Sequence, residues 1–191
     1  LALAMFSTEQ SLPAMVRHWN VGFWALLAFA MQMALVFVTG HALASAPPVR
    51  RLLDRLAAIP RTPAQAIVTV SLIALVGCWI NWGFGLVIGA VMARALARQV
   101  KGVDYPLLVA SAYSGFLVWH GGLSGSIPLA LAGGGPDVVK VSAGVIDAPI
   151  GVVLTLFTPL NLTIIAFLVI GLPLLNPVSY THLTLPTTPY V

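Results

Sequence analysis

Polar side chains that could bind a ligand are concentrated in two short glycine-rich segments of an otherwise apolar chain, residues 81–85 and residues 121–126. Asn81 begins the first segment and offers an amide oxygen and two amide donors. Ser124 and Ser126 bring two hydroxyls to the second segment, just before an expected half-helix. Because the start of a helix presents unpaired N–H groups to an anion, this combination suits a small carboxylate.

Aromatic and imidazole side chains accompany the same segments. Trp82 and Phe84 could contact the apolar tail of a substrate. His120 fits a role in the site and a role in packing equally well. The glycines allow a competing interpretation, because Gly85 and Gly89 form a Gly-x-x-x-Gly pair that lets helices pack closely. The candidate substrate- and ion-binding residues are Asn81, Trp82, Gly83, Gly85, His120, Gly121, Gly122, Ser124 and Ser126.

Signals of an enzyme are sparse. The sequence contains no Gly-x-Ser-x-Gly, no His-Glu-x-x-His and no phosphate-binding loop motif. A hydrolytic dyad of His120 with Ser124 or Ser126 is conceivable, but its spacing within a glycine run is not that of a known nucleophile elbow. The aspartates around these segments all lie in predicted loops: Asp104, Asp137 and Asp147. We therefore predict no enzymatic activity, no metal site and no cofactor other than a coupling Na⁺ or H⁺.

The composition indicates a protein that crosses a membrane several times. Of 191 residues, 59% are hydrophobic and 7% are charged, whereas a soluble domain carries about 25% charged residues. So little charge excludes a soluble globular protein, and so much apolar surface excludes disorder. The net charge of +4 comes from basic residues in short loops, which indicates membrane orientation rather than nucleic-acid binding. The single Cys78 cannot form an internal disulfide.

Helices that could position the two segments are predicted from four stretches that lack Asp, Glu, Lys and Arg. They are Gly22–Ala44, Gln65–Ala93, Tyr105–Ala132 and Pro149–Leu175. Basic segments at residues 46–64 and 94–104 flank the second stretch. Since Lys and Arg favour the cytoplasmic side, both basic segments are expected on that side of the membrane.

The second stretch cannot be one straight helix under that topology. A continuous helix over Gln65–Ala93 would be about 44 Å long, against about 30 Å for the hydrocarbon core, and would separate the two basic segments. The Asn and two Gly residues in its middle are poor helix formers. We therefore predict a break near Asn81–Gly85, giving a re-entrant hairpin or two short crossings.

The third stretch has a similar interruption. An apolar run over Tyr105–Trp119 precedes the segment His120–Ser126, and Ile127–Ala132 follows as a half-helix. Non-helical backbone at membrane depth must be buried in protein or line a cavity. We predict one discontinuous crossing here, with Pro149–Leu175 returning to the cytoplasm. The predicted fold class is an all-α polytopic membrane protein with a broken or re-entrant hairpin and a discontinuous helix.

The two ends of the sequence differ from the rest. Residues 1–178 are predicted to be one partial membrane domain that begins within an apolar segment. Residues 179–191 are rich in Thr and Pro and lack helical periodicity, so we predict a non-native or disordered tail there.

Four motifs in order resemble the bacterial short-chain fatty acid transporter family. The resemblance covers residues from Met5 to Ile146, extends to Pro177 and does not include the tail. Its motifs are Gly22–Leu35 continuing into Val38–Ala44, then Ile80–Val87, Asp104–Leu108 and Gly121–Leu129.

This resemblance implies a carrier of short-chain carboxylates such as acetoacetate or butyrate in the bacterial inner membrane. It also implies the first half of an inverted-repeat, ion-coupled carrier with re-entrant hairpins, working by alternating access. The expected partners are the carboxylate substrate and the lipid bilayer, without nucleic acid; a homo-oligomer is left open. The family's motif breaks map here onto Asn81–Gly85 and Gly121–Ser126.

Three other functions fit some of the same residues. A carrier of dicarboxylates or of another small anion would favour a more polar cavity than Trp82 and Phe84 suggest. An intramembrane hydrolase would use Ser124 or Ser126 as its nucleophile. A non-transporting membrane scaffold would use the glycine-rich segments for assembly alone.

Overall fold

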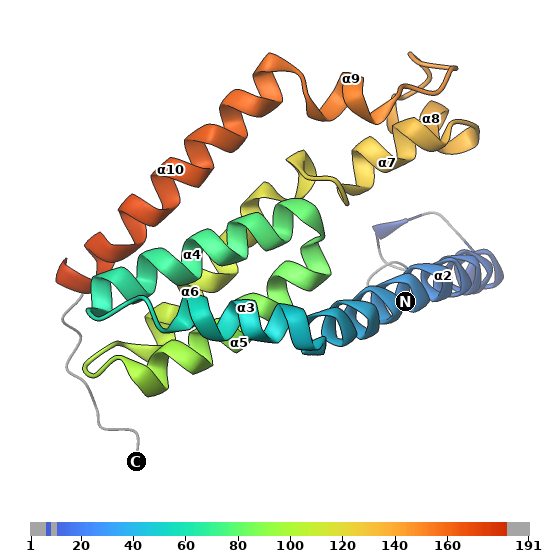
Figure 1. The fold of residues 1–191 in the computed structure, drawn as a ribbon. Coiled ribbons are helices and arrows are strands. Elements are labelled where there is room, and N and C mark those ends of the chain that lie inside the picture. Colours follow the sequence, from blue (N-terminus) through green and yellow to red (C-terminus); the bar gives the residue numbers. More distant parts are fainter. Residues whose placement is uncertain (1–6, 9–10, 183–191) are drawn as a thin grey trace. The chain divides into compact units, whose positions relative to one another are not determined.

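The structure, a computed structural model, describes residues 7–8 and 11–182, and over these residues every regular element is a helix. The predicted all-α class is therefore confirmed for this part of the chain. In chain order the elements are α2 (Leu12–Ser45), α3 (Pro47–Ala57), α4 (Pro63–Ile80), α5 (Trp82–Gln99), α6 (Tyr105–Ser114), the 3₁₀ helix η1 (Gly115–Gly121), α7 (Ser126–Gly133), α8 (Pro136–Val141), α9 (Val152–Leu156) and α10 (Pro159–His182), as Figure 1 shows.

The chain divides into two compact units, and the boundary falls within α2 between Val38 and Thr39. The described part of the first unit is mainly the N-terminal portion of α2. There Trp24 Nε1 donates a hydrogen bond to Asn20 Oδ1 at 2.8 Å. The predicted first span, Gly22–Ala44, lies within the single helix α2, so its helical character is confirmed.

The predicted break of the second stretch is present. Asn81 alone separates α4 from α5, in an extended conformation with φ −153° and ψ 119°. Its side-chain Oδ1 accepts a hydrogen bond from the N–H of Phe84 at 3.0 Å, which caps the start of α5. The break is shorter than predicted, because Gly83 and Gly85 belong to the first turns of α5. One capping Asn is enough to end one helix and start the next.

Small residues let α4 and α5 pack against each other in opposite directions. A Cβ atom on Gly85 would lie 2.2 Å from Cys78 N, and one on Gly77 would lie 2.8 Å from the Gly85 Cα. One turn further along α5, a Cβ on Gly89 would lie 3.4 Å from the Ala74 Cβ, one turn back along α4. This antiparallel pairing brings the beginning of α4 and the end of α5 to the same end, as the topology argument predicts.

The third stretch is interrupted as predicted, with different boundaries. Asp104 Oδ1 accepts from Leu107 N at 3.0 Å and starts α6, but the helix tightens into η1 at Gly115. Residues 122–125 are non-helical, and α7 begins at Ser126 rather than at Ile127. The α6–η1 unit runs parallel to α4, since a Cβ on Gly115 would lie 2.7 Å from Ala74 atoms and one on Gly122, after η1, would lie 2.5 Å from the carbonyl oxygen of Trp79, later in α4.

The fourth stretch is not the uninterrupted return that we predict from the sequence. It breaks between α9 and α10, and Pro159 begins the second helix. The physical reason is that Pro159 lacks the N–H that a continuous helix would need at that position. In the segment predicted as a tail, α10 continues from Ser179 to His182, and residues 183–191 lie outside the described part.

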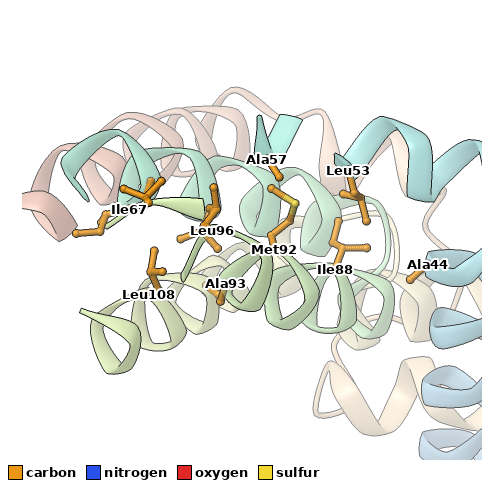
Figure 2. Packing of buried hydrophobic residues seen from close by; sticks show 13 residues of the cluster. Ala44, Leu53, Ala57, Ile67, Ile88, Met92, Ala93, Leu96 and Leu108 are labelled. Atoms are coloured by element: carbon orange, nitrogen blue, oxygen red, sulfur yellow. The ribbon is translucent and has the colours of Figure 1, made fainter. Parts of the chain in front are cut away.

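The main buried cluster joins α3, α4, α5 and α6 (Figure 2). Leu53 and Ala57 of α3 contribute to it together with Ile88 and Met92 of α5. In Figure 2, Leu53 lies by Ile88 and Ala57 by Met92, so α3 follows the middle of α5. The arginines of α3 are exposed on its other side: Arg50, Arg51 and Arg55.

Apolar surface remains exposed on helices long enough to cross a membrane. Over the described residues, α4 and the Pro159–Tyr180 part of α10 have the length and composition of membrane spans, and Ala30–Ser45 is a shorter apolar helical segment. On α10, Leu160 is 72% exposed and Phe167 is 75% exposed. Exposure of this kind along a whole helix face is typical of contact with lipid or with another part of a membrane protein.

Candidate substrate and ion site

The two helix breaks meet in the folded chain. The backbone N–H of Trp82, at the start of α5, donates to Ser124 Oγ at 3.0 Å, across 42 residues of sequence. A second hydrogen bond joins Leu123 N to the carbonyl oxygen of Trp79 at 2.8 Å. We call this contact between residues 79–82 and residues 122–124 the break junction. It places a serine hydroxyl at the positive end of the helix α5.

Glycine at position 122 makes this contact possible. A Cβ atom there would lie 2.5 Å from the Trp79 carbonyl oxygen and 2.9 Å from the Trp79 Cα. Gly125, which precedes α7, is equally enclosed, since its Cβ would lie 2.8 Å from the His120 carbonyl oxygen. The glycines of the second segment therefore serve close backbone packing at the break junction, whatever further role they have.

Aromatic rings surround the break junction. Trp82 is 7% exposed, and its ring lies 5.5 Å from Trp119 and 5.9 Å from Phe116, measured between ring centroids. Trp119 Nε1 donates to the Ser124 carbonyl oxygen at 3.3 Å. His120 stacks on Trp119 with a centroid distance of 4.2 Å. These rings form an apolar wall with polar groups along one edge.

The other predicted aromatic, Phe84, does not join this wall. Its side chain is partly buried and packs against the main cluster of α3, α4, α5 and α6. On the same turn the backbone of Gly83 approaches α2, because a Cβ on Gly40 would lie 3.1 Å from the Gly83 carbonyl carbon. Trp82 and Phe84 thus face different neighbours, and only Trp82 lines the break junction.

The structure sorts the nine candidate residues into three environments. Asn81, Trp82, Gly122 and Ser124 form the break junction or adjoin it. The buried glycines pack against other backbone: Gly83 against α2 and Gly85 against α4. Gly121 accepts a hydrogen bond from α10, as described below, while His120 and Ser126 are exposed.

The start of α7 retains hydrogen-bonding capacity. Gly125 precedes the helix without a side chain to cap it, and the first helical residue is the exposed Ser126. Inside the helix, the N–H of Leu129 bonds to the Gly125 carbonyl at 3.1 Å. The N–H groups of Ser126 and Ile127 lie before that first bond and have no acceptor within the helix. They can bind an anion beside the Ser126 hydroxyl.

Two asparagines of α10, absent from the candidate residues predicted above, make hydrogen bonds between helices. Asn161 Nδ2 donates to the Gly121 carbonyl at 3.2 Å and to the Leu156 carbonyl at 2.7 Å. Asn176 Nδ2 donates to Ser71 Oγ at 2.9 Å and to Ser114 Oγ at 3.0 Å. The sequence does show that each is an amide side chain inside an apolar span. Such an amide must form hydrogen bonds with other helices, because an unpaired polar group is costly in an apolar environment.

Two hollows in the described structure lie away from the break junction. One, of about 90 Å³, is between α5 and α6, and the other, of about 390 Å³, is between the start of α4 and Pro177 of α10. The second is bordered by Gln65 and Thr69 as well as by apolar side chains. Neither hollow is lined by a residue of the break junction.

Over the described residues, the all-helical fold with two candidate membrane spans is that of a membrane protein. Comparison with known families agrees: the model of the family described as short chain fatty acid transporter matches residues 1–182. The chain belongs to the short-chain fatty acid transporter family, and the predicted resemblance is confirmed.

Two curated relatives carry the name "Putative short-chain fatty acid transporter". The one from Escherichia coli (strain K12) is 50% identical over 174 residues, which cover 91% of this chain and 38% of the relative. The one from Haemophilus influenzae (strain ATCC 51907 / DSM 11121 / KW20 / Rd) is 46% identical over 175 residues, covering 88% of this chain and 38% of the relative. The chain thus spans less than half the length of these relatives. No solved structure matches it.

Proposed function

We propose that the protein transports short-chain fatty acids of the acetoacetate or butyrate type across the bacterial inner membrane. The observation that supports this most is the break junction, which brings two discontinuous helices and an aromatic wall together. In transporters of this design, helix starts bind anionic groups and unwound backbone binds the coupling ion. Family membership supports a short-chain fatty acid as the substrate class.

Within this proposal the carboxylate binds at the start of α7. The N–H groups of Ser126 and Ile127 and the Ser126 hydroxyl are hydrogen-bond donors to it. The exposed His120 is near in sequence and stacks on Trp119 at 4.2 Å, which orients the imidazole. The short acyl tail lies against the rings of Trp82 and Trp119. An apolar wall favours a monocarboxylate over a dicarboxylate, whose second charge would lose its hydration there.

The α4–α5 hairpin is re-entrant in this account. α3 packs beside the middle of α5 while exposing Arg50, Arg51 and Arg55. Three exposed guanidinium groups belong in the headgroup layer or in water, not in hydrocarbon. We therefore place α3 toward the bilayer surface, on the side of the basic segments, with the break at Asn81 at the opposite end of the hairpin.

Transport proceeds by alternating access in which the two broken segments move relative to the remaining helices. The bonds between Trp82 and Ser124 and between Trp79 and Leu123 are the contacts that would open and re-form. Coupling to a cation supplies the driving force. Within the described membrane helices of this account, α4, α6 and α10, there is no Asp or Glu side chain. A neutral oxygen site for a cation is therefore favoured over a carboxylate proton relay in this part of the protein.

The experiment that tests the function is uptake of radiolabelled butyrate by proteoliposomes containing the full-length gene product. We expect uptake that unlabelled acetoacetate inhibits more strongly than succinate. Ser126→Ala should weaken butyrate binding and uptake together, while Thr163→Ala, on an exposed part of α10, serves as the control. A hydrolase would instead lose turnover and keep binding, and a scaffold would show no uptake in any variant. Inhibition chiefly by succinate would support the dicarboxylate alternative.

A further inference from the structure

A second polar cluster lies among α4, α6 and α10, apart from the break junction. Asn176 of α10 bridges Ser71 of α4 and Ser114 of α6 through its Nδ2 atom, at 2.9 Å and 3.0 Å. Ser71 is completely buried and lies halfway along α4 (Pro63–Ile80). Polar groups at the centre of a membrane helix are costly unless they are paired or serve a function.

The hydroxyl groups of Ser71 and Ser114 already donate hydrogen bonds within their own helices. Ser71 Oγ donates to the Ile67 carbonyl at 2.8 Å, and Ser114 Oγ donates to the Ser111 carbonyl at 2.7 Å. The amide N–H groups of Asn176 donate to the hydroxyl oxygens of Ser71 and Ser114. A hydroxyl oxygen has two lone pairs and accepts only one of these amide bonds. The unused capacity of the cluster is therefore acceptor capacity, which suits a positively charged ligand.

Ser111 adds an oxygen with no partner. Its side chain is 1% exposed, and its Oγ has no hydrogen bond in the described structure. Ser111 is one helical turn before Gly115, which packs on Ala74 and Leu75 of α4. Since α6–η1 and α4 are parallel, one turn back from Leu75 is Ser71, which places Ser111 on the face of α6 toward the cluster. An unpaired buried hydroxyl lowers stability unless a ligand pairs with it.

The prolines of α10 supply a further acceptor. Pro177 follows Asn176 directly and has no N–H, so the carbonyl of Pro173, four residues earlier, lacks its usual helical donor. Pro173 is buried and shares a helix face with Asn176 and Pro177. Two prolines in one span thus enrich the neighbourhood of Asn176 in backbone oxygen.

We propose that Ser71, Ser111, Ser114 and Asn176, with the Pro173 carbonyl, form the binding site of a monovalent cation, tested here as Na⁺. The proposal rests on the cation-coupled transport proposed above and gives the cation its place. The cluster has no carboxylate, so it cannot neutralise a divalent ion, and it has no titratable group that could carry a proton. Neutral oxygens in a dry site are ligands for a dehydrated monovalent ion.

Asn176 acts as the switch between the empty and the occupied site. In the present state its amide nitrogen occupies the space between two hydroxyl oxygens and donates to both. Rotation of the amide by half a turn brings Oδ1 into that space, so that three side-chain oxygens and the Ser111 hydroxyl can surround the ion. The same helix carries Asn161, which bonds to Gly121 at the second break. Movement of α10 on cation binding is therefore transmitted to Gly121, which directly precedes the break junction.

The test is equilibrium binding of ²²Na⁺ to the purified full-length gene product, without any carboxylate present. We expect saturable binding that Ser111→Ala weakens at least tenfold. Because the Ser111 hydroxyl has no hydrogen bond, its removal should leave the unfolding midpoint equal or higher, which separates a lost ligand from a misfolded variant. Asn176→Asp keeps the oxygen and adds charge, so it should retain cation binding. Thr163→Ala is the control on the exposed side of α10.

The outcomes distinguish this proposal from the transport function. Absence of saturable ²²Na⁺ binding, or wild-type binding by Ser111→Ala, overturns the cation site. Loss of binding in Ser124→Ala but not in Ser111→Ala also overturns it, because the ion would then be at the break junction. Butyrate uptake driven by a proton gradient without ²²Na⁺ binding removes the cation site and leaves the transport function. Sodium binding without carboxylate uptake supports the site and contradicts the function.

Discussion

At the scale of single residues, Ser124 carries the contact between the two breaks. Its hydroxyl accepts the Trp82 N–H at 3.0 Å while its carbonyl accepts from Trp119 Nε1 at 3.3 Å. The sequence indicated a polar role for Ser124 but could not indicate its partner, because Trp82 is 42 residues away. The serine predicted as a free ligand group is engaged in the present state. Ser126 is the hydroxyl that remains accessible.

Ser124→Ala tests the value of this contact. Removing the acceptor should lower the free energy of unfolding by about 1 kcal/mol, the usual net contribution of a hydrogen bond. The measurement is chemical unfolding of the full-length gene product in mixed micelles. Ser126→Ala is the matched control, since an exposed hydroxyl should change stability by less than about 0.5 kcal/mol. Equal stability of both variants would show that the Ser124 bond contributes nothing.

Gly85 tests the packing of the hairpin. A methyl group there would lie 2.2 Å from Cys78 N, so Gly85→Ala should destabilise the protein by about 1–3 kcal/mol through overpacking. Gly171→Ala is the matched control, because nothing lies within 4 Å of a Cβ at that position of α10. The control should gain about 0.5–1 kcal/mol from higher helix propensity. Thermal unfolding in detergent that ranks the two variants in the opposite order would contradict the helix packing described here.

At the scale of elements, local chemistry predicted where helices stop. Asn81 and its neighbouring glycines indicated the end of α4, and the Gly121–Ser126 segment indicated the start of a half-helix. Tertiary contacts decided what the sequence could not show. Gly83 and Gly85 are helical because α4 and α2 pack against them, although glycine propensity argued for a turn. The break before Pro159 was readable from the proline and was missed because the whole stretch was apolar.

The orientation of the hairpin gives a prediction at this scale. Arg61 precedes α4 and Arg98 lies near the end of α5, and both are exposed at the same end of the antiparallel pair. Single variants Arg61→Cys and Arg98→Cys should react with a membrane-impermeant maleimide only from the cytoplasmic face. The native Cys78 is completely buried and should not react with the maleimide. Reaction of the two variants from opposite faces would mean that α4 and α5 do not form a hairpin in the membrane.

At the scale of the whole molecule, α10 connects the second helix break with the polar cluster around Asn176. Its first turn contacts the second break through Asn161, and its last turns contact the polar cluster through Asn176. Near its end, Tyr180 OH donates to the carbonyl of Gly102, which lies within the basic segment of residues 94–104, at 3.2 Å. These connections span the chain and have no local sequence signature beyond amides in an apolar helix. A topology of spans could be predicted from the sequence, but their lateral arrangement could not.

Alternating access makes a prediction about this arrangement. Ala44 of α2 and Ile88 of α5 belong to one buried cluster, so a bifunctional thiol reagent should link Ala44→Cys to Ile88→Cys. If α5 moves relative to α2 during transport, the link should reduce butyrate uptake by proteoliposomes at least tenfold, and a cleavable reagent should restore it. Each single-cysteine variant treated with the same reagent is the control. Uptake that continues in the linked protein would contradict movement between these helices.

We propose above that a short-chain carboxylate binds at the start of α7, next to the break junction. The most direct measurement is the rate at which a thiol reagent modifies Ser126→Cys in the full-length gene product, with and without butyrate. Ser126 is exposed in the present state, so modification should be rapid without substrate. Butyrate should slow it at least severalfold, whereas Thr163→Cys on α10 should react at one rate in both conditions. Equal rates at Ser126→Cys with saturating butyrate, in protein that takes up butyrate, would place the substrate elsewhere and contradict the account.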